Sequence, residues 1–206
     1  MTRFLRAACL ASVAAGVGLA VLGADRAHAA CDVDKPRAEM SYEDAQAVWE
    51  CLKDDLYAGY NAGPKRWIPK AFVEDYRDWG LASTLPADPG FHSGRYLLTY
   101  VNETGFDAYT EFAEGDDVTV PAGTVIAKES FTVTEDGAAR KGPLFFMQKV
   151  EAGVSPETDD WYYMMVAPGG QPMAINVYTA CSQCHQETFA HQGGMGYPVP
   201  EVRVSK

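Results

Sequence analysis

Residues 124–134 read Thr-Val-Ile-Ala-Lys-Glu-Ser-Phe-Thr-Val-Thr and show the strongest strand pattern in the chain. β-Branched and aromatic residues favour strands, and the preceding Pro121-Ala122-Gly123 predicts a turn. Stretches with similar strand character lie on both sides, at residues 95–101, 144–151 and 160–166. Because short turns join these four stretches, we predict an antiparallel sheet.

Helical patterns flank the predicted sheet. Ser41, with Asp44 three residues later, is typical of a helix N-cap, and apolar residues then recur at helical spacing until Gly59. Shorter helices are expected at residues 69–79 and 106–112, and a last one at residues 177–189. The fold class predicted is therefore α+β, predominantly antiparallel β-sheet with an N-terminal and a C-terminal helix.

The first thirty residues have the pattern of a secretory signal peptide. Arg3 and Arg6 precede an uncharged stretch, and small residues follow at Ala27-His28-Ala29-Ala30. We therefore expect a signal peptide at 1–30, export to the periplasm, and one domain at 31–206. No stretch is long and apolar enough to predict a membrane span. Cleavage leaves Cys31 at or near the new N-terminus, but His28 stands where a lipobox has Leu, so we favour export without lipidation.

The exported chain is strongly acidic. The full sequence has a net charge of −11, and removing residues 1–30 takes away three Arg and one Asp, which leaves 14 basic and 27 acidic side chains and a net charge of −13. Such a surface repels nucleic acid and anionic membranes, and it could attract a basic redox partner protein. Solubility alone is the plainer interpretation.

Four cysteines remain after cleavage, and two of them form a candidate disulfide. Cys181 and Cys184 belong to a Cys-x-x-Cys-His motif, which leaves Cys31 and Cys51 as a pair. In an oxidising compartment we expect these two to be joined, which would tie the N-terminal tail to the first helix. Two free thiols are the alternative.

The motif Cys181-Ser-Gln-Cys184-His185 is typical of covalent haem attachment. Two Cys on one helical turn can add to both haem vinyl groups, and the adjoining His then reaches the iron. The alternatives are a zinc half-site, a redox dithiol and a simple disulfide. Zinc would need a second ligand pair, and a redox dithiol is expected early in the chain. We therefore predict one haem c, with its iron bound by His185 on the C-terminal helix.

The motif lies close to the C-terminus, so few residues follow it that could supply a sixth ligand to the iron. The side chains that could occupy that position are His92, Met173, His191 and Met195, and none has a clear route to the distal face. We therefore expect a five-coordinate, high-spin iron with an open distal site. An electron-transfer cytochrome would need the position to be filled. A four-helix cytochrome c-prime also carries its motif late, but residues 95–166 lack long helical periods.

Five segments in order resemble the cytochrome P-460 family, which includes the beta-type cytochromes c-prime. The segments are Tyr76-Arg77-Asp78-Trp79, Arg95 to Asn102, Pro121 to Glu129, Asp160-Trp161-Tyr162-Tyr163 and Cys181 to Gln186. The resemblance implies a β-rich homodimer with an open distal side. It also implies that the protein oxidises hydroxylamine to nitric oxide or nitrous oxide, or that it binds nitric oxide or carbon monoxide without catalysis.

The resemblance assigns further residues to the haem site. Lys128 matches the lysine that catalytic members bond covalently to the haem, and Glu151 matches a distal carboxylate that relays protons. Strand alternation alone places Lys128 on the more polar face, which indicates a solvated lysine instead. An ordinary surface acid is the alternative for Glu151. Phe91, Phe145 and Phe146 are candidates for an aromatic distal wall, although alternation sends only one of the last two inward.

Overall fold

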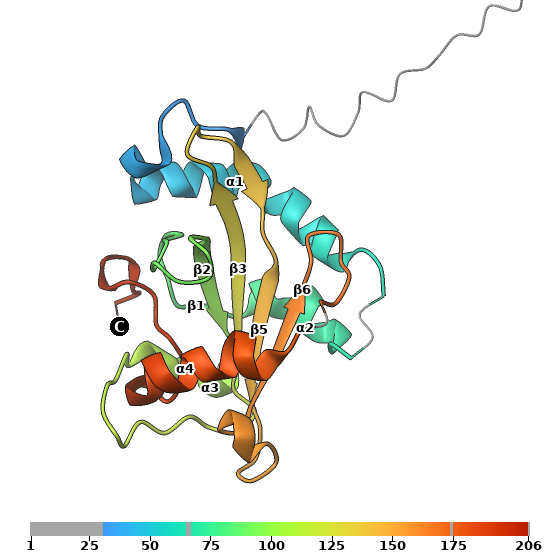
Figure 1. The fold of residues 1–206 in the computed structure, drawn as a ribbon, viewed down its shortest axis with the longest axis vertical. Coiled ribbons are helices and arrows are strands. Elements are labelled where there is room, and N and C mark those ends of the chain that lie inside the picture. The colour runs from blue at the N-terminus through green and yellow to red at the C-terminus, as the bar shows by residue number, and fades with distance from the viewer. Residues whose placement is uncertain (1–30, 65–66, 174, 206) are drawn as a thin grey trace, which may run out of the picture.

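The computed structural model describes residues 31–64, 67–173 and 175–205, so the signal peptide predicted for residues 1–30 lies outside the described residues. An antiparallel sheet forms the centre of the fold (Figure 1). Its strand order is β1-β2-β3-β5-β6, and β4 pairs with β3 beside this path. The strands are β1 (Gly80–Leu81), β2 (Tyr96–Val101), β3 (Val125–Val133), β4 (Ala139–Lys141), β5 (Leu144–Lys149) and β6 (Trp161–Val166).

The four predicted strands are confirmed as β2, β3, β5 and β6, and two short strands were missed. β4 falls in a polar, glycine-containing stretch that has no strand pattern of its own, and it forms because the end of β3 extends far enough to pair with it. β1 comprises only Gly80 and Leu81 and pairs with the end of β2. Pairing with a neighbour, not local propensity, makes both strands.

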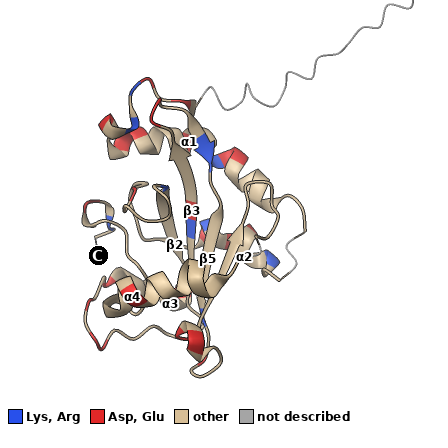
Figure 2. Ribbon diagram, viewed as in Figure 1, with Lys and Arg blue, Asp and Glu red and all other residues tan. Residues whose placement is uncertain are grey.

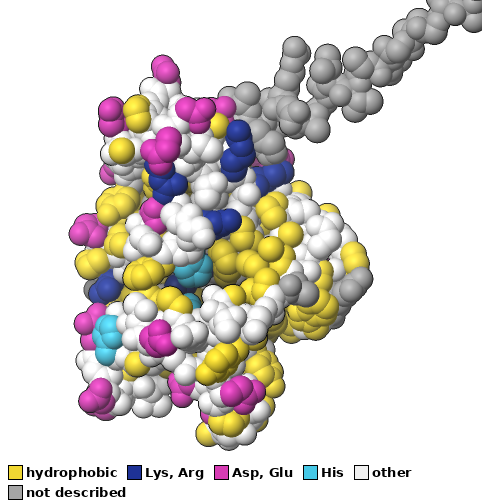
Figure 3. All heavy atoms as spheres, in the orientation of Figure 1, with side chains coloured by type: hydrophobic (Ala, Val, Ile, Leu, Met, Phe, Trp, Pro, Cys, Tyr) yellow, Lys and Arg dark blue, Asp and Glu magenta, His cyan; other side chains and the backbone are white. Residues whose placement is uncertain are grey.

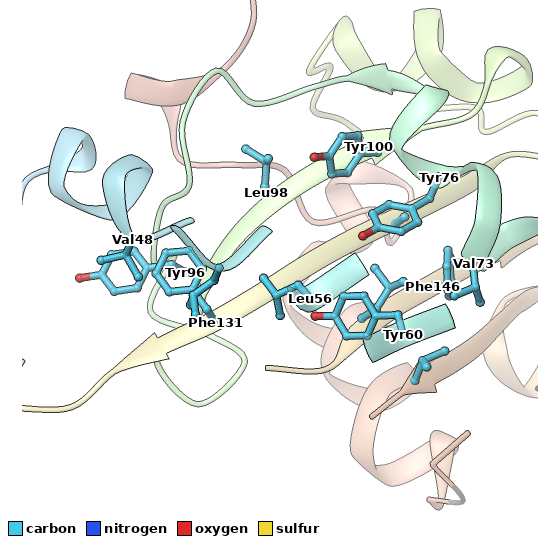
Figure 4. Packing of buried hydrophobic residues seen from close by; sticks show 14 of the residues in the cluster. Val48, Leu56, Tyr60, Val73, Tyr76, Tyr96, Leu98, Tyr100, Phe131 and Phe146 are labelled. Atoms are coloured by element: carbon cyan, nitrogen blue, oxygen red, sulfur yellow. The ribbon is translucent and has the colours of Figure 1, made fainter. Parts of the chain in front are cut away.

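α1 (Tyr42–Asn61) covers one face of the sheet (Figure 1). Ser41 and Asp44 form the predicted cap reciprocally, because each side chain accepts a hydrogen bond from the backbone N–H of the other. The predicted disulfide between Cys31 and Cys51 is present and joins the N-terminal segment to α1. Figure 4 shows the core on this face, to which α1, α2 and alternate residues of the strands contribute. α2 (Lys70–Asp75) continues into a 3-10 turn (Tyr76–Asp78).

The opposite face is covered by the C-terminal part of the chain. α3 (Glu103–Thr110), a π-helical turn (Tyr178–Ser182) and α4 (Gln183–Phe189) are the helical pieces near it. The segment after α4 then packs on the strands: Trp161 Nε1 donates to the carbonyl of Gly193 at 3.1 Å, and Met195 is fully buried. None of the described helices is long and apolar enough to cross a membrane.

β3 alternates between these two faces. The side chains of Ile126, Lys128 and Ser130 point to the face that the C-terminal part of the chain covers. The side chain of Glu129 points to the face that α1 covers, where its carboxylate is buried. It accepts hydrogen bonds from Trp49 Nε1 at 3.2 Å and from Tyr76 Oη at 3.1 Å, and it forms an ion pair with Arg77. This cluster fixes the central strand against α1 and the 3-10 turn, and so fixes which face Lys128 occupies.

We predict that Arg77→Met lowers the free energy of unfolding by about 3–5 kcal/mol, because it leaves the carboxylate of Glu129 buried without a cation. Adding Glu129→Gln to that variant should recover part of the loss, since the amide carries no charge and its carbonyl oxygen can still accept from Trp49 Nε1, while its NH2 group can donate to the hydroxyl of Tyr76. Urea unfolding measures both. Lys70→Met is the control, because Lys70 pairs with Glu74 on the surface, with 76% of its side chain exposed. Equal losses for Arg77→Met and Lys70→Met would contradict the prediction.

Candidate haem site

The Cys-x-x-Cys-His motif spans a change of helix type. Cys181 lies in the π-helical turn, whereas Cys184 and His185 lie in α4. The two thiols are not bonded to each other; Cys184 is exposed and Cys181 is partly buried. This arrangement brings both thiols and the imidazole to the wall of one cavity. Among the described residues, no group of three or more His, Cys, Asp or Glu side chains is arranged to hold a metal ion, so the zinc alternative has no ligand set there.

His185 is oriented by a backbone contact. Its Nδ1 lies 2.6 Å from the carbonyl oxygen of Gly194, so Nδ1 carries the proton and Nε2 is the nitrogen left for a metal. The ring is also packed by Tyr163 and by Phe189, one helical turn further on. Burial and the nearby charge of Lys128 lower the pKa of His185 to about 4. The imidazole is therefore neutral at pH 7, which is the form that binds metals.

A cavity of about 610 Å³ lies between α4 and the sheet. Figure 3 shows a hollow on this face of the molecule, with histidine side chains inside it and hydrophobic side chains around it. The volume falls within the range of roughly 300–1,000 Å³ that is common for small-molecule and cofactor sites. Most of the lining is apolar and includes Trp67, Ile126, Met147, Met164, Met165, Ile175 and Val177.

Lys128 lies on the wall of this cavity and is not a solvated lysine. Only 7% of the residue is exposed, and its Nζ donates to the carbonyl of Gly196 at 2.6 Å. Gly196 also lies against the ring of His185, where an added Cβ would be 3.5 Å from Cε1. Burial lowers the pKa of Lys128 to about 8. The structure therefore brings a buried amine and the motif histidine to the same loop.

Of the four side chains considered as a sixth ligand of the iron, two line the cavity and two do not. Met195 is buried in the core and His191 is on the surface, and neither lines the cavity. His92 and Met173 do line it, although the sequence indicated no route for them. His92 reaches the cavity from the loop before β2, where His92 and Ser93 have φ of 56° and 58°. A left-handed turn of this kind leaves no periodic signal in the sequence.

The other predicted site residues are only partly brought together. Phe91 and Phe145, two of the three candidates for a distal wall, line the cavity; their place on the distal side stays a prediction. Phe146 also borders it, but its ring is packed among Phe72, Tyr76 and Trp79 on the α1 side of the sheet. Glu151 is exposed beyond the end of β5 and does not line the cavity. Its catalytic role stays a prediction from the resemblance.

Two buried polar atoms on the cavity wall help to test whether these residues fit a haem. Arg95 Nε and Tyr163 Oη have no hydrogen-bond partner among the described residues. Buried polar groups are usually satisfied. An unsatisfied guanidinium nitrogen suits the carboxylate side chains of a haem, while the apolar wall suits its ring system. Together with the two thiols and the free Nε2 of His185, the residues present fit the group.

Comparison with known proteins agrees with this fit. The family model described as Cytochrome P460 matches residues 73–192, which is more than half of the chain. The matched region includes Tyr76, Lys128 and the whole Cys-x-x-Cys-His motif. No curated protein sequence matches the chain.

Proposed function

Because the chain belongs to the cytochrome P460 family, whose members carry covalently attached haem c with iron, we propose that it is an exported mono-haem cytochrome that oxidises hydroxylamine to nitric oxide or nitrous oxide. In this proposal Cys181 and Cys184 form the thioether bonds, and His185 Nε2 binds the iron. The side of the iron opposite His185 is left open to a small nitrogenous ligand. Haem, when bound, supplies one-electron chemistry and an iron site for that ligand.

The burial of Lys128 is the observation that carries the proposal. A lysine at a polar strand position would ordinarily be solvated, and desolvating it is costly. Here the amine is held inside the cavity by a hydrogen bond to Gly196, next to the loop that orients His185. A buried amine at this position is what a covalent bond to the haem requires. Lys128 is thus the residue that favours the hydroxylamine-oxidising members over the gas-binding members.

Export and electron transfer complete the proposed function. The disulfide between Cys31 and Cys51 suits an oxidising compartment, and the predicted signal peptide would deliver the chain to the periplasm. Figure 2 shows acidic residues on the helices and loops around the sheet. This surface suits a basic redox partner that takes up the electrons removed from hydroxylamine. The homodimer stays a prediction from the resemblance.

Steady-state oxidation of hydroxylamine by the purified protein, with an artificial electron acceptor, tests the proposal. We expect turnover with nitric oxide or nitrous oxide as the product. We also expect a high-spin spectrum of the ferrous protein before substrate is added, because the proposal leaves the distal side open. No turnover, or a low-spin ferrous spectrum with sharp split bands, would contradict it; the second result would favour an electron carrier.

Binding of nitric oxide or carbon monoxide without catalysis is the second candidate function. Two observations favour it: the wall of the cavity is largely apolar, and the carboxylate of Glu151 lies outside the cavity. A gas-binding protein needs an open pocket and no proton acceptor beside the ligand. In that case the protein would bind either gas but would not turn over hydroxylamine.

A further inference from the structure

The backbone of residues 193–197, which we call the glycine loop, contacts two side chains of the candidate haem site at once. The carbonyl oxygen of Gly194 lies 2.6 Å from Nδ1 of His185, and the carbonyl oxygen of Gly196 accepts from Nζ of Lys128 at 2.6 Å. One residue separates the two carbonyl groups. A displacement of this short stretch would therefore change the contacts of the imidazole and of the amine together.

The glycine loop is fixed by contacts with other elements of the fold. Trp161 Nε1 of β6 donates to the carbonyl of Gly193 at 3.1 Å, and Tyr109 Oη of α3 donates to the carbonyl of Gly196 at 3.1 Å. Both aromatic side chains are buried, and Met195, in the middle of the loop, is fully buried as well. The loop is therefore held against the sheet and α3, and its carbonyl groups have fixed directions.

Gly196 is the residue of this loop that leaves no room for a side chain beside the site. Its φ is 64°, which lies in the left-handed region that residues with a Cβ atom rarely adopt. An added Cβ would lie 3.3 Å from the ring of Phe189, which packs on His185, and 3.5 Å from Cε1 of His185 itself. The residue whose carbonyl holds Lys128 is thus packed against the imidazole.

The contact with Gly196 also limits how the amine of Lys128 is oriented. Within the described residues, the carbonyl of Gly196 is the one hydrogen-bond acceptor of Lys128 Nζ. A neutral amine has two N–H groups and one lone pair, and the lone pair is the part that can form a bond to carbon. When one N–H is donated to Gly196, fewer directions are left for the lone pair. The amine lies on the wall of the cavity, so those directions include the cavity itself.

We propose that Gly196 is a positioning residue of this site: its carbonyl directs the amine of Lys128 toward the haem, and the loop that contains it orients His185 through Gly194. A hydrogen bond from Nδ1–H makes an imidazole a stronger ligand for a metal. The glycine loop therefore sets both the position of the amine and the strength of the bond between His185 and the iron. This inference rests on the proposed haem site and on the role of Lys128 in it, but not on hydroxylamine being the substrate.

Gly196→Ala in the holoprotein tests this role. We expect the fraction of chains that carry the Lys128 cross-link to fall about tenfold, because the loop leaves a conformation that alanine disfavours by roughly that factor. Mass spectrometry of the digest measures this fraction. The iron–histidine stretching band in the resonance Raman spectrum of the ferrous protein should move to lower frequency, because the hydrogen bond at Nδ1 weakens. The thioether-bound haem should stay in place.

The matched control is Gly153→Ala. Gly153 also has a left-handed φ, 83°, but an added Cβ there would meet no atom within 4 Å, and Gly153 does not line the cavity. This variant introduces a similar backbone strain away from the site. It should change neither the cross-linked fraction nor the iron–histidine band.

A pair of tyrosine variants keeps the test decisive if Gly196→Ala does not fold, which a loss of covalent haem would reveal. Tyr109→Phe removes the hydroxyl that donates to the carbonyl of Gly196, so it should lower the cross-linked fraction in the same direction. Tyr197→Phe removes a neighbouring hydroxyl that donates instead to the carbonyl of Ala113 at 2.9 Å. This second variant should leave the cross-link as it is in the wild-type protein.

An unchanged cross-linked fraction and an unchanged iron–histidine band in Gly196→Ala would overturn the inference. If that variant does not fold, equal cross-linking in Tyr109→Phe and Tyr197→Phe would overturn it. A wild-type protein without any cross-link would overturn the role of Gly196 together with the main support for the proposed function. If hydroxylamine is not oxidised although the cross-link depends on Gly196, the proposed catalysis fails and the role of Gly196 stands.

Discussion

Replacing both Cys181 and Cys184 by Ala is expected to abolish covalent haem attachment completely. Both thiols lie on the cavity wall and are not joined to each other, so each is available to form a thioether bond. Haem staining of the protein in a denaturing gel measures the effect, because only covalently bound haem remains with the chain. The wild-type protein should stain, and the double variant should show no stain.

The matched control is Cys31→Ala with Cys51→Ala, which removes the other cysteine pair. That disulfide closes a loop of 20 residues, so its loss should lower the free energy of unfolding by about 3 kcal/mol. The control variant should nevertheless keep its haem stain. Extraction of all haem from the wild-type protein by acid acetone would contradict the thioether assignment.

Lys128→Ala is expected to abolish hydroxylamine oxidation while the thioether-bound haem stays in place. A covalent bond from a lysine would distort the haem, and distortion is one of the ways in which a protein changes the electronic properties of this group. The wild-type ferrous protein should therefore have an absorption band far to the red of ordinary haem c, and the variant should lose it. Optical spectra and turnover assays of the two proteins measure both effects.

Two further lysine variants separate the cross-link from the loss of a positive charge. Lys128→Arg keeps a cation in the cavity but cannot form the same bond, so it should behave like Lys128→Ala. Lys149→Ala removes a lysine of β5 that does not line the cavity and instead donates to the carbonyl of Asp159 at 2.7 Å. It should keep both the band and the activity. A red-shifted band that survives in Lys128→Ala would remove the main support for the enzyme.

The sheet was largely predictable because its strands carry their own local signals. β-Branched runs bounded by Pro and Gly marked β3 and its neighbours, and a helical period after a Ser cap marked α1. The haem motif was predictable for the same reason, since three fixed residues within five positions are recognised without any knowledge of the fold. The Cys31–Cys51 pair followed from the absence of any other partner once Cys181 and Cys184 were assigned.

The positions that sequence reasoning missed or left open depend on contacts between distant parts of the chain. Alternation placed Lys128 on a polar face and so indicated solvent, but the segment after α4 covers that face and buries the amine against Gly196. His92 is brought to the cavity by a left-handed turn that has no periodicity. Met195 entered the sequence reasoning only as a candidate ligand of the iron, and it is buried because the same C-terminal segment packs on the sheet.

The resemblance pointed to segments whose physical role only the structure explains. Tyr76 and Arg77 precede β3 by some fifty residues in sequence, yet both contact the carboxylate of Glu129 on that strand. Because Glu129 is the direct neighbour of Lys128, this buried cluster on the α1 side determines that Lys128 points to the side of the cavity. Pairings over such a separation cannot be read from local patterns.

Peptide mass spectrometry of the digested holoprotein tests the central claim most directly. The proposed site predicts one cross-linked species in which the peptide that contains Lys128 is joined, through the haem, to the peptide that contains Cys181, Cys184 and His185. The same digest of Lys128→Ala should contain haem on the motif peptide alone. A wild-type Lys128 peptide that runs free and unmodified would contradict the claim, and the gas-binding cytochrome would then be the better description of this protein.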